Sequence, residues 1–153
     1  FPSEERIPLW HMRLMSLRRD VRLRAWLDDG ALVGLTYTVS RPTMLWLFYF
    51  AVNDAVRSRG YGSRILSHLR QEAEGRKIVL EIEPLDDGAP NIEQRRRRRS
   101  FYERTGFTLT GYRIREGKQT YSVMADGDFD PIAFRRLVHW FTLGLRPTSL
   151  MRD

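Results

Sequence analysis

Residues 46–75, WLFYFAVNDAVRSRGYGSRILSHLRQEAEG, decide the fold that this sequence predicts. Residues 46–52 form an unbroken apolar and aromatic run, which is typical of a strand buried on both faces. From Gly62 onward the apolar residues recur at helical spacing, and Gly75 marks the expected end of that helix. The stretch therefore predicts a strand, a glycine-bearing turn and a helix, in that order.

The turn itself has the sequence RSRGYG over residues 57–62. Glycines at the start of a helix let a ligand approach the backbone, and the unpaired amides there favour phosphate. Arg57 and Arg59 add positive charge beside them. The turn is neither a nucleotide P-loop, because no Lys-Ser/Thr pair follows, nor a Rossmann fingerprint, because Ile65 replaces the third glycine. The alternative is a helix start whose glycines serve only close packing.

The composition limits the class of protein. A chain of 153 residues predicts a single domain with a real core. The chain has no cysteine and its three histidines lie far apart in sequence, so we expect no metal site. No apolar run is long enough to span a membrane and no signal peptide is visible, so we expect a cytoplasmic protein without a membrane partner. The net charge of +7 favours anionic partners without choosing among them.

The chain before the central stretch predicts a helix and a hairpin. Residues 1–20 are expected to be helical, with a methionine-bearing apolar face that either belongs to the core or lines a binding cleft. Strands over residues 21–27 and 31–39 follow, joined by a turn at Gly30. In the first of these strands the alternation predicts an inward face that consists of Val21, Leu23, Ala25 and Leu27.

The chain after the central stretch predicts two more helices and three strands. We expect a strand over residues 77–83 and then a helix capped by Asn91 and Gln94 that stops at Gly106. Strands over residues 107–113 and 119–125 come next, followed by a last helix over residues 131–143 that begins at Pro131. This last helix has too many apolar positions for one narrow stripe, so it either packs on the sheet or forms a homodimer interface.

A second motif, SFYERTGF at residues 100–107, joins a helix to a strand. Together with Arg57, Gly60 and Gly62 it resembles the two signatures of the GNAT superfamily, the GCN5-related N-acetyltransferases, in their family order. The resemblance covers about residues 25–125 and implies one acetyltransferase domain over residues 1–153. The implied fold class is α/β (α+β), with a mixed, mostly antiparallel twisted sheet flanked by helices.

The resemblance also implies acetyl-CoA as co-substrate. The strand that ends at Val52 and the strand from Lys77 would be parallel neighbours that splay apart, and the pantetheine arm would pair with the backbone of Ala51 and Val52. The pyrophosphate would lie on the glycine turn. The turn residues assigned to the cofactor in this way are Arg57, Ser58, Arg59, Gly60, Tyr61, Gly62 and Ser63.

Two carboxylates and a tyrosine are the candidate catalytic residues. A lysine-like amine, with a pKa of ~10.4, must lose a proton before it can attack a thioester. Glu81 and Glu83 lie on one face of their strand, where mutual repulsion would raise one pKa. Either could be the base, with Glu83 favoured because it is nearer the strand end; the alternative is a solvated sheet edge. By resemblance Tyr102 protonates the departing thiolate, the alternative being a structural tyrosine.

The sequence departs from the family pattern in three places. The first strand of the fold is not visible, and we expect it upstream of Phe1. Arg95 stands where many members have an asparagine that touches the cofactor, so that role is not transferred. Residues 46–52 contain no acid, which leaves the next strand to supply the base. The arginine run at residues 95–99 covers more than one helical turn, so most of it must be solvated, while one or two members could meet the 3′-phosphate of CoA.

The expected function is acetyl transfer from acetyl-CoA to a primary amine of a small-molecule or peptide acceptor, by direct attack in a ternary complex. One alternative is a non-catalytic CoA-binding regulatory domain. The other is a basic nucleic-acid-binding module, suggested by the net charge of +7. No recognised nucleic-acid motif is present, and that interpretation leaves the glycine turn unexplained.

Overall fold

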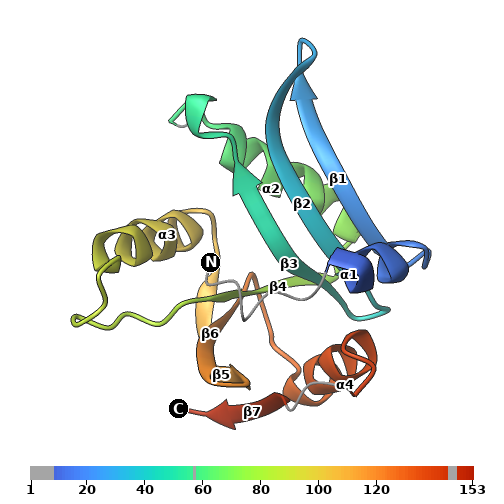
Figure 1. The fold of residues 1–153 in the computed structure, drawn as a ribbon, viewed down its shortest axis with the longest axis vertical. Coiled ribbons are helices and arrows are strands. Elements are labelled where there is room, and N and C mark those ends of the chain that lie inside the picture. Colours follow the sequence, from blue (N-terminus) through green and yellow to red (C-terminus); the bar gives the residue numbers. More distant parts are fainter. Residues whose placement is uncertain (1–8, 57, 145–147) are drawn as a thin grey trace.

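The computed structural model describes residues 9–56, 58–144 and 148–153, which form a seven-stranded sheet in the order β1-β2-β3-β4-β6-β5-β7 (Figure 1). The parallel pair is β3 with β4, and the other neighbouring pairs are antiparallel. The mixed, mostly antiparallel sheet is therefore confirmed. The elements are α1 (Leu9–Ser16), β1 (Val21–Asp28), β2 (Ala31–Ser40), β3 (Met44–Val52), a 3-10 turn (Asp54–Val56), α2 (Tyr61–Ala73), β4 (Lys77–Ile82), α3 (Ile92–Arg104), β5 (Thr108–Glu116), β6 (Gln119–Ala125), α4 (Pro131–Phe141) and β7 (Thr148–Arg152).

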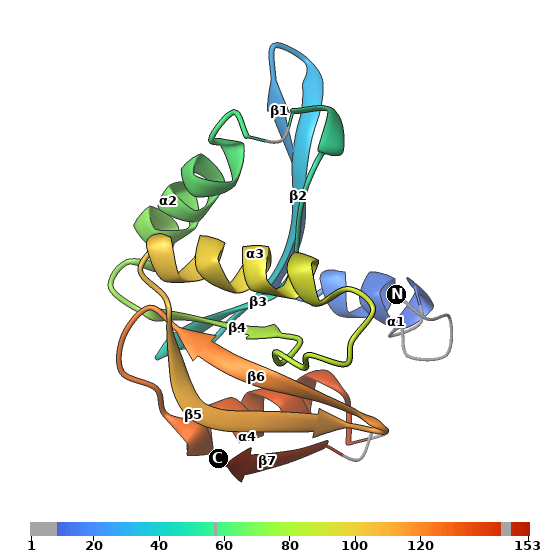
Figure 2. The same cartoon turned by 90° about the vertical axis from the view of Figure 1, so that its left-hand side faces the viewer.

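The sheet opens between its two parallel strands. Strands β3 and β4 pair at three positions, of which Trp46 with Val79 is the last. Beyond that pair β3 continues to Val52 and β4 to Ile82 without further pairing to each other. The predicted splaying is thus confirmed. In Figure 2 the arm formed by β1, β2 and β3 rises away from β4, β6, β5 and β7, and α3 lies across the region where the two parts separate.

A bulge in β3 accompanies this opening. The register between β2 and β3 shifts between the pairs Tyr37–Tyr49 and Thr38–Leu47, which leaves Phe48 as an extra residue in β3. A bulge bends its strand and increases the local twist. The bend falls directly after the last pair with β4, so it helps to direct the end of β3 away from that strand.

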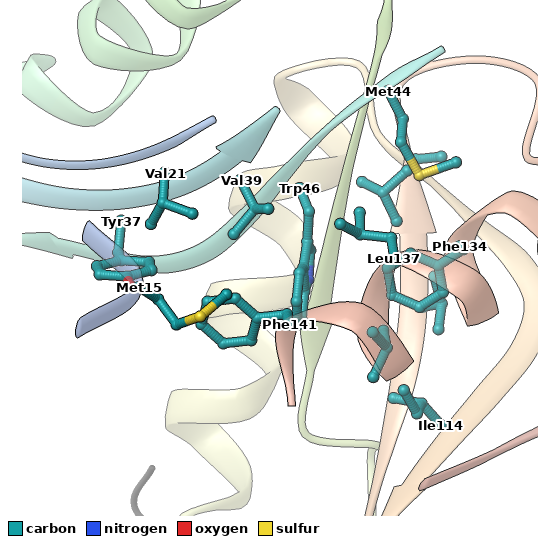
Figure 3. Close-up of a cluster of buried hydrophobic side chains, with 14 residues drawn as sticks. Met15, Val21, Tyr37, Val39, Met44, Trp46, Ile114, Phe134, Leu137 and Phe141 are labelled. Atoms are coloured by element: carbon teal, nitrogen blue, oxygen red, sulfur yellow. The ribbon is translucent and has the colours of Figure 1, made fainter. Parts of the chain in front are cut away.

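The two faces of the sheet have separate cores. On one face α1 and α4 contribute Met15 and Phe141 to a cluster around Tyr37 and Trp46 (Figure 3). On the other face α2 and α3 cover a cluster that includes Leu66, Leu69, Leu80, Tyr102 and Phe107. The last helix therefore packs on the sheet, and Met15, which is 1% exposed, belongs to the core.

The predicted inward face of β1 is wrong except at Val21. Leu23 and Leu27 are 58% and 63% exposed. The opposite face is the covered one, because α2 lies against it: Arg24 pairs with Glu72 of α2 at 2.5 Å, and Trp26 packs against the α2–α3 core. Alternation in the sequence identified two faces but not which of them a helix would cover.

One other local expectation was wrong, and one strand was not predicted. Asn91 precedes α3 but makes no capping bond to it, because its side-chain oxygen instead accepts a hydrogen bond from Arg95 Nε at 2.8 Å. Strand β7 was not expected, and it pairs with β5 at the edge of the sheet. The first eight residues of the predicted N-terminal helix lie outside the described residues. None of the helices in the described ranges is long and apolar enough to cross a membrane.

Candidate active site

The first turn of α2 has the geometry that the glycine motif predicted. Gly60 is the N-cap residue and has a φ of 79°, in the left-handed region that favours glycine. Because the N-cap residue is a glycine, it has no side-chain oxygen to cap the first amides of the helix. Ser58, Arg59 and Ser63 are exposed around it, whereas Arg57 lies outside the described residues. The turn can therefore offer backbone donors and positive charge to an anion.

Gly62 allows α3 to approach this turn. A Cβ on Gly62 would lie 3.0 Å from Cζ of Phe101 and 3.6 Å from Cγ2 of Val52. The absence of a side chain thus brings the first turn of α2, the end of β3 and the aromatic motif of α3 together. The two sequence motifs, about 40 residues apart in the chain, meet at this glycine.

The side chain of Tyr61, within the glycine turn, contacts residues outside that turn. Its hydroxyl donates a hydrogen bond to Asp28 Oδ2 at 2.6 Å, and the guanidinium of Arg64 lies 4.4 Å from its ring centroid. The hydrogen bond to Asp28 raises the pKa of Tyr61. Tyr61 therefore connects the start of α2 to the end of β1.

The end of β3 supplies the predicted backbone edge. Ala51 and Val52 are half-buried and pair with Leu35 and Gly34 of β2. Their other edge faces the opening, because β3 pairs with β4 only as far as Trp46. Backbone groups on an unpaired strand edge can bind a ligand in the manner of an added strand.

Tyr102 is almost completely buried in α3. It is 8% exposed and packs against Phe101 and Phe107, with ring centroids 5.3 and 5.6 Å away. Burial raises the pKa of Tyr102 to about 12, while the charge of Arg98 acts in the opposite direction. The phenol therefore keeps its proton throughout the physiological pH range and can donate it.

Glu81 carries its carboxyl into the interior of the protein. Its Oε1 is buried and has no hydrogen-bond partner among the described residues. Burial raises the pKa of Glu81 well above its ordinary value, and the charge of Glu116 on β5 raises it further. The indole N–H of Trp46 acts in the opposite direction and lowers it. A buried carboxyl with a raised pKa is the form expected of a general base that works near neutral pH.

Glu83 has a different environment. It follows the end of β4, and its carboxylate forms ion pairs with Arg98 Nη1 at 2.8 Å and Arg95 Nη2 at 3.3 Å. The repulsion between Glu81 and Glu83 that the sequence suggested is not what raises the pKa of Glu81, because Glu116 is the neighbouring acid that contributes. The two candidate bases are thus distinguishable: Glu81 is buried, and Glu83 is neutralised by two arginines.

Most of the arginine run on α3 is engaged within the protein. Arg96 pairs with Asp87 and Glu93, and Arg99 pairs with Glu103. Arg95 and Arg98 hold Glu83, and Arg97 is exposed. The run therefore mainly neutralises acids of α3 and of the segment before it.

Sequence reasoning missed Trp46, Glu116 and Asp28 as parts of this region. Trp46 was expected only as part of a buried strand and Glu116 was given no role, because nothing local indicates that strands β3, β4 and β5 place them around Glu81. In the described part of the chain, no three His, Asp or Glu side chains gather as a group that could hold a metal ion.

Comparisons with known proteins agree with this geometry. The family model described as "Acetyltransferase (GNAT) domain" matches residues 22–109. A structure from Bacteroides thetaiotaomicron assigned to the GNAT family is 31% identical, covers 95% of this chain and 86% of its own, and superposes with a TM-score of 0.71. No curated protein matches the sequence.

Two more distant structures share the fold and contain coenzyme A. An aminoglycoside 6′-N-acetyltransferase is 20% identical, covers 76% of this chain and 79% of its own, and has a TM-score of 0.58. The PaiA N-acetyltransferase of Thermoplasma acidophilum is 15% identical, covers 78% and 69%, and has a TM-score of 0.57. The family match over more than half of the chain, together with the first of these structures, shows that this chain belongs to the GNAT family of acetyltransferases.

Proposed function

We propose that this chain is an acetyl-CoA-dependent N-acetyltransferase that acts on a primary amine of a small-molecule or peptide acceptor. The observation that carries the proposal is the meeting of two features at one end of the sheet. There β3 and β4 separate after Trp46 and Val79, and the uncapped first turn of α2 lies beside the end of β3. The opening offers a strand edge to an extended ligand, and the helix end offers amides to its phosphates.

The residues at this opening fit the CoA moiety. The amides after Gly60 and the charge of Arg59 suit a pyrophosphate, and a side chain at Gly62 would fill the space that α3 now occupies. The backbone of Ala51 and Val52 suits the pantetheine arm. Arg57, Ser58, Tyr61 and Ser63 complete the proposed cofactor set, with Tyr61 acting through its bond to Asp28 rather than by direct contact.

Glu81 is the residue that we assign as the base, with Glu83 as the second candidate. Acetyl-CoA supplies a thioester carbonyl that an amine can attack. Glu81 takes a proton from the ammonium, so that the nitrogen lone pair can form the new C–N bond. Amides at the free edge of β3 stabilise the developing oxyanion. Glu83 is less suited because its ion pairs with Arg95 and Arg98 occupy both of its oxygens.

Tyr102 completes the transfer. When the C–S bond breaks, the thiolate of CoA takes the proton of the Tyr102 phenol, which burial keeps protonated. The nitrogen loses its second proton as the tetrahedral intermediate collapses, and that proton restores the phenol. The base on β4 and the acid on α3 are separate groups on separate elements. This division supports direct attack in a ternary complex rather than a covalent acetyl-enzyme intermediate.

The test is an acceptor screen that measures CoA release. Because the chain contains no cysteine, every thiol that a disulfide reagent detects in the reaction comes from CoA. The panel should include peptide N-termini, lysine peptides, polyamines, aminoglycosides and simple arylalkylamines. We expect thiol release that depends on one acceptor class and is lost in Glu81→Gln. Tight acetyl-CoA binding without transfer to any acceptor would instead favour the regulatory alternative.

A further inference from the structure

Trp46 lies at the apex of the opening between β3 and β4. It forms the last pair of that ladder, with Val79. Its ring is 1% exposed and meets Phe134 and Phe141 edge-on, with centroids 5.7 and 5.3 Å away (Figure 3). Phe48 packs edge-on against it as well, with its centroid 5.0 Å away. Its Nε1 is buried and makes no hydrogen bond to the described residues. The packing fixes the ring, and with it the direction of the N–H group.

Glu81 lies on the same side of the sheet as this indole. Val79 belongs to the same core cluster as Trp46, and Glu81 is two residues further along β4, so alternation places its side chain on that face. Its Oε1 is also buried and without a partner in the described part of the chain. A buried donor and a buried acceptor are thus both unsatisfied at the same end of the opening, which is uncommon and calls for a reason.

The groups around Glu81 act on it in opposite directions. Burial and the charge of Glu116 favour the protonated carboxyl, whereas the indole N–H of Trp46 favours the ionised one. On β6 the residue opposite Glu81 is apolar Val123, and α4 faces this region with Phe134, Leu137 and Phe141. Other titratable groups in or against this cluster are Tyr37 on β2, Tyr112 on β5, Tyr121 on β6 and His11 on α1, which contacts Phe141. Past the end of β4 lies Glu83 with its two arginines.

We propose that Trp46 is the positioning residue for the base of the proposed acetyl transfer: its indole N–H donates a hydrogen bond to the Glu81 carboxylate whenever that carboxyl is ionised. The catalytic role of this hydrogen bond rests on the proposed function, in which Glu81 is the base. In the ionised state the bond holds the carboxylate in one orientation at the apex. When Glu81 takes the proton of the amine, the bond weakens, and the carboxyl becomes free to pass that proton to solvent.

The direct test does not need an acceptor. The four tryptophans give four indole ¹⁵N–¹H resonances, and Trp46→Phe identifies the one that belongs to Trp46. We expect the Trp46 resonance to shift as pH rises, with a midpoint above the ordinary glutamate range and equal to that of the Glu81 side-chain carboxyl ¹³C signal. In Glu81→Gln this shift should vanish. Trp140, which lies under Arg18 and Arg41, is the internal reference because arginine does not titrate in this range.

Two variants should move the Glu81 titration in opposite directions. Trp46→Phe removes the donor but keeps an aromatic ring, and should raise the midpoint by about one pH unit. Glu116→Gln removes the neighbouring charge and should lower it. Phe134→Leu loosens the same packing without removing a donor, and should leave the midpoint unchanged. An indole resonance that stays constant while Glu81 titrates would overturn the proposal, as would equal shifts in Trp46→Phe and Phe134→Leu.

Measurements of turnover test the role of Trp46 separately from the proposed role of Glu81 as the base. With an acceptor from the screen, Trp46→Phe should move the acidic limb of the pH profile of kcat toward higher pH. The KM for acetyl-CoA should stay unchanged. If Glu81→Gln retains full activity, the assignment of the base fails. If Glu81→Gln is inactive but Trp46→Phe leaves the limb in place, the role of Trp46 alone fails.

Discussion

Phe101 of α3 lies against Gly62 of α2, so that a Cβ on Gly62 would come within 3.0 Å of the Phe101 ring. Phe101 belongs to the second sequence motif and Gly62 to the first, and each helps to place the other. The close contact means that the turn proposed to bind the pyrophosphate is positioned by the helix that carries Tyr102. A change at either residue should therefore alter both stability and cofactor binding.

Gly62→Ala should destabilise the fold by about 1–3 kcal/mol, because the added methyl group overpacks against Phe101. It should also weaken acetyl-CoA binding, since the turn must shift to make room. Adding Phe101→Leu to Gly62→Ala should recover part of both losses. The measurement is a double-mutant cycle in urea unfolding and in acetyl-CoA affinity, and strictly additive effects would show that the two residues are not coupled.

Tyr102→Phe should lower kcat by about 10²–10⁴-fold while leaving the affinity for acetyl-CoA nearly unchanged, because only the proton donor is lost. Burial raises the pKa of the Tyr102 phenol to about 12, so it should cause no falling limb in the wild-type profile below about pH 11. Steady-state kinetics across pH check both points.

Tyr37 offers a matched control for this substitution. Burial also raises its pKa to about 12, but its hydroxyl donates to the Met12 carbonyl at 2.9 Å, on the other face of the sheet. Tyr37→Phe should cost about 1 kcal/mol of stability and leave kcat unchanged. Equal kcat in wild type and Tyr102→Phe would remove the acid role.

Glu81→Gln should reduce kcat/KM by about 10²–10⁴-fold at pH values where the wild-type carboxyl is ionised, and the difference should shrink toward low pH, where that carboxyl is protonated and cannot act as a base. Glu83→Gln should have a much smaller effect on turnover, because the Glu83 carboxylate is held by Arg95 and Arg98. The pH dependence of kcat/KM in the two variants decides between them. A larger loss in Glu83→Gln than in Glu81→Gln would reverse the ranking proposed here.

Glu81→Gln should also stabilise the protein at high pH. The pKa of Glu81 is higher in the folded chain than in the unfolded one, so the folded state binds the proton more tightly. That contribution is fully present below the unfolded pKa and is lost as pH rises through the folded pKa. The variant should therefore melt above wild type at pH 8 and close to it at pH 4. Glu83→Gln, which breaks two ion pairs, should melt below wild type at pH 8, so a lower Tm in both variants would contradict the buried-charge explanation for Glu81.

The strand-turn-helix core was predictable because its signals are local. The apolar run before Val52, the glycines at positions 60 and 62 and the helical spacing to Ala73 each depend on neighbours in the sequence. The separation of β3 from β4 was predicted from the family resemblance. The pairing of the two strands shows that it begins after Trp46.

The features that were missed depend on contacts between distant segments. The exposure of Leu23 follows from where α2 lies, which alternation within β1 does not reveal. The environment of Glu81 combines β3, β4 and β5, so its neighbours Trp46 and Glu116 were not visible as a group. Asparagine is a common N-cap residue, but the side-chain oxygen of Asn91 accepts a hydrogen bond from Arg95 instead of from the helix amides.

Calorimetric titration of acetyl-CoA into the wild-type chain and into Gly60→Asn tests the central claim most directly. Gly60 has a φ of 79°, and a Cβ added there would have no atom of the described residues within 4 Å apart from its two chain neighbours. Because asparagine tolerates the left-handed region, this variant should keep its Tm. We predict saturable binding by wild type, and binding weaker by about tenfold or more, equivalent to about 1.4 kcal/mol, in Gly60→Asn, because its side chain stands where the phosphates approach. No binding by wild type, or equal affinity in the two proteins, would contradict the proposed cofactor site.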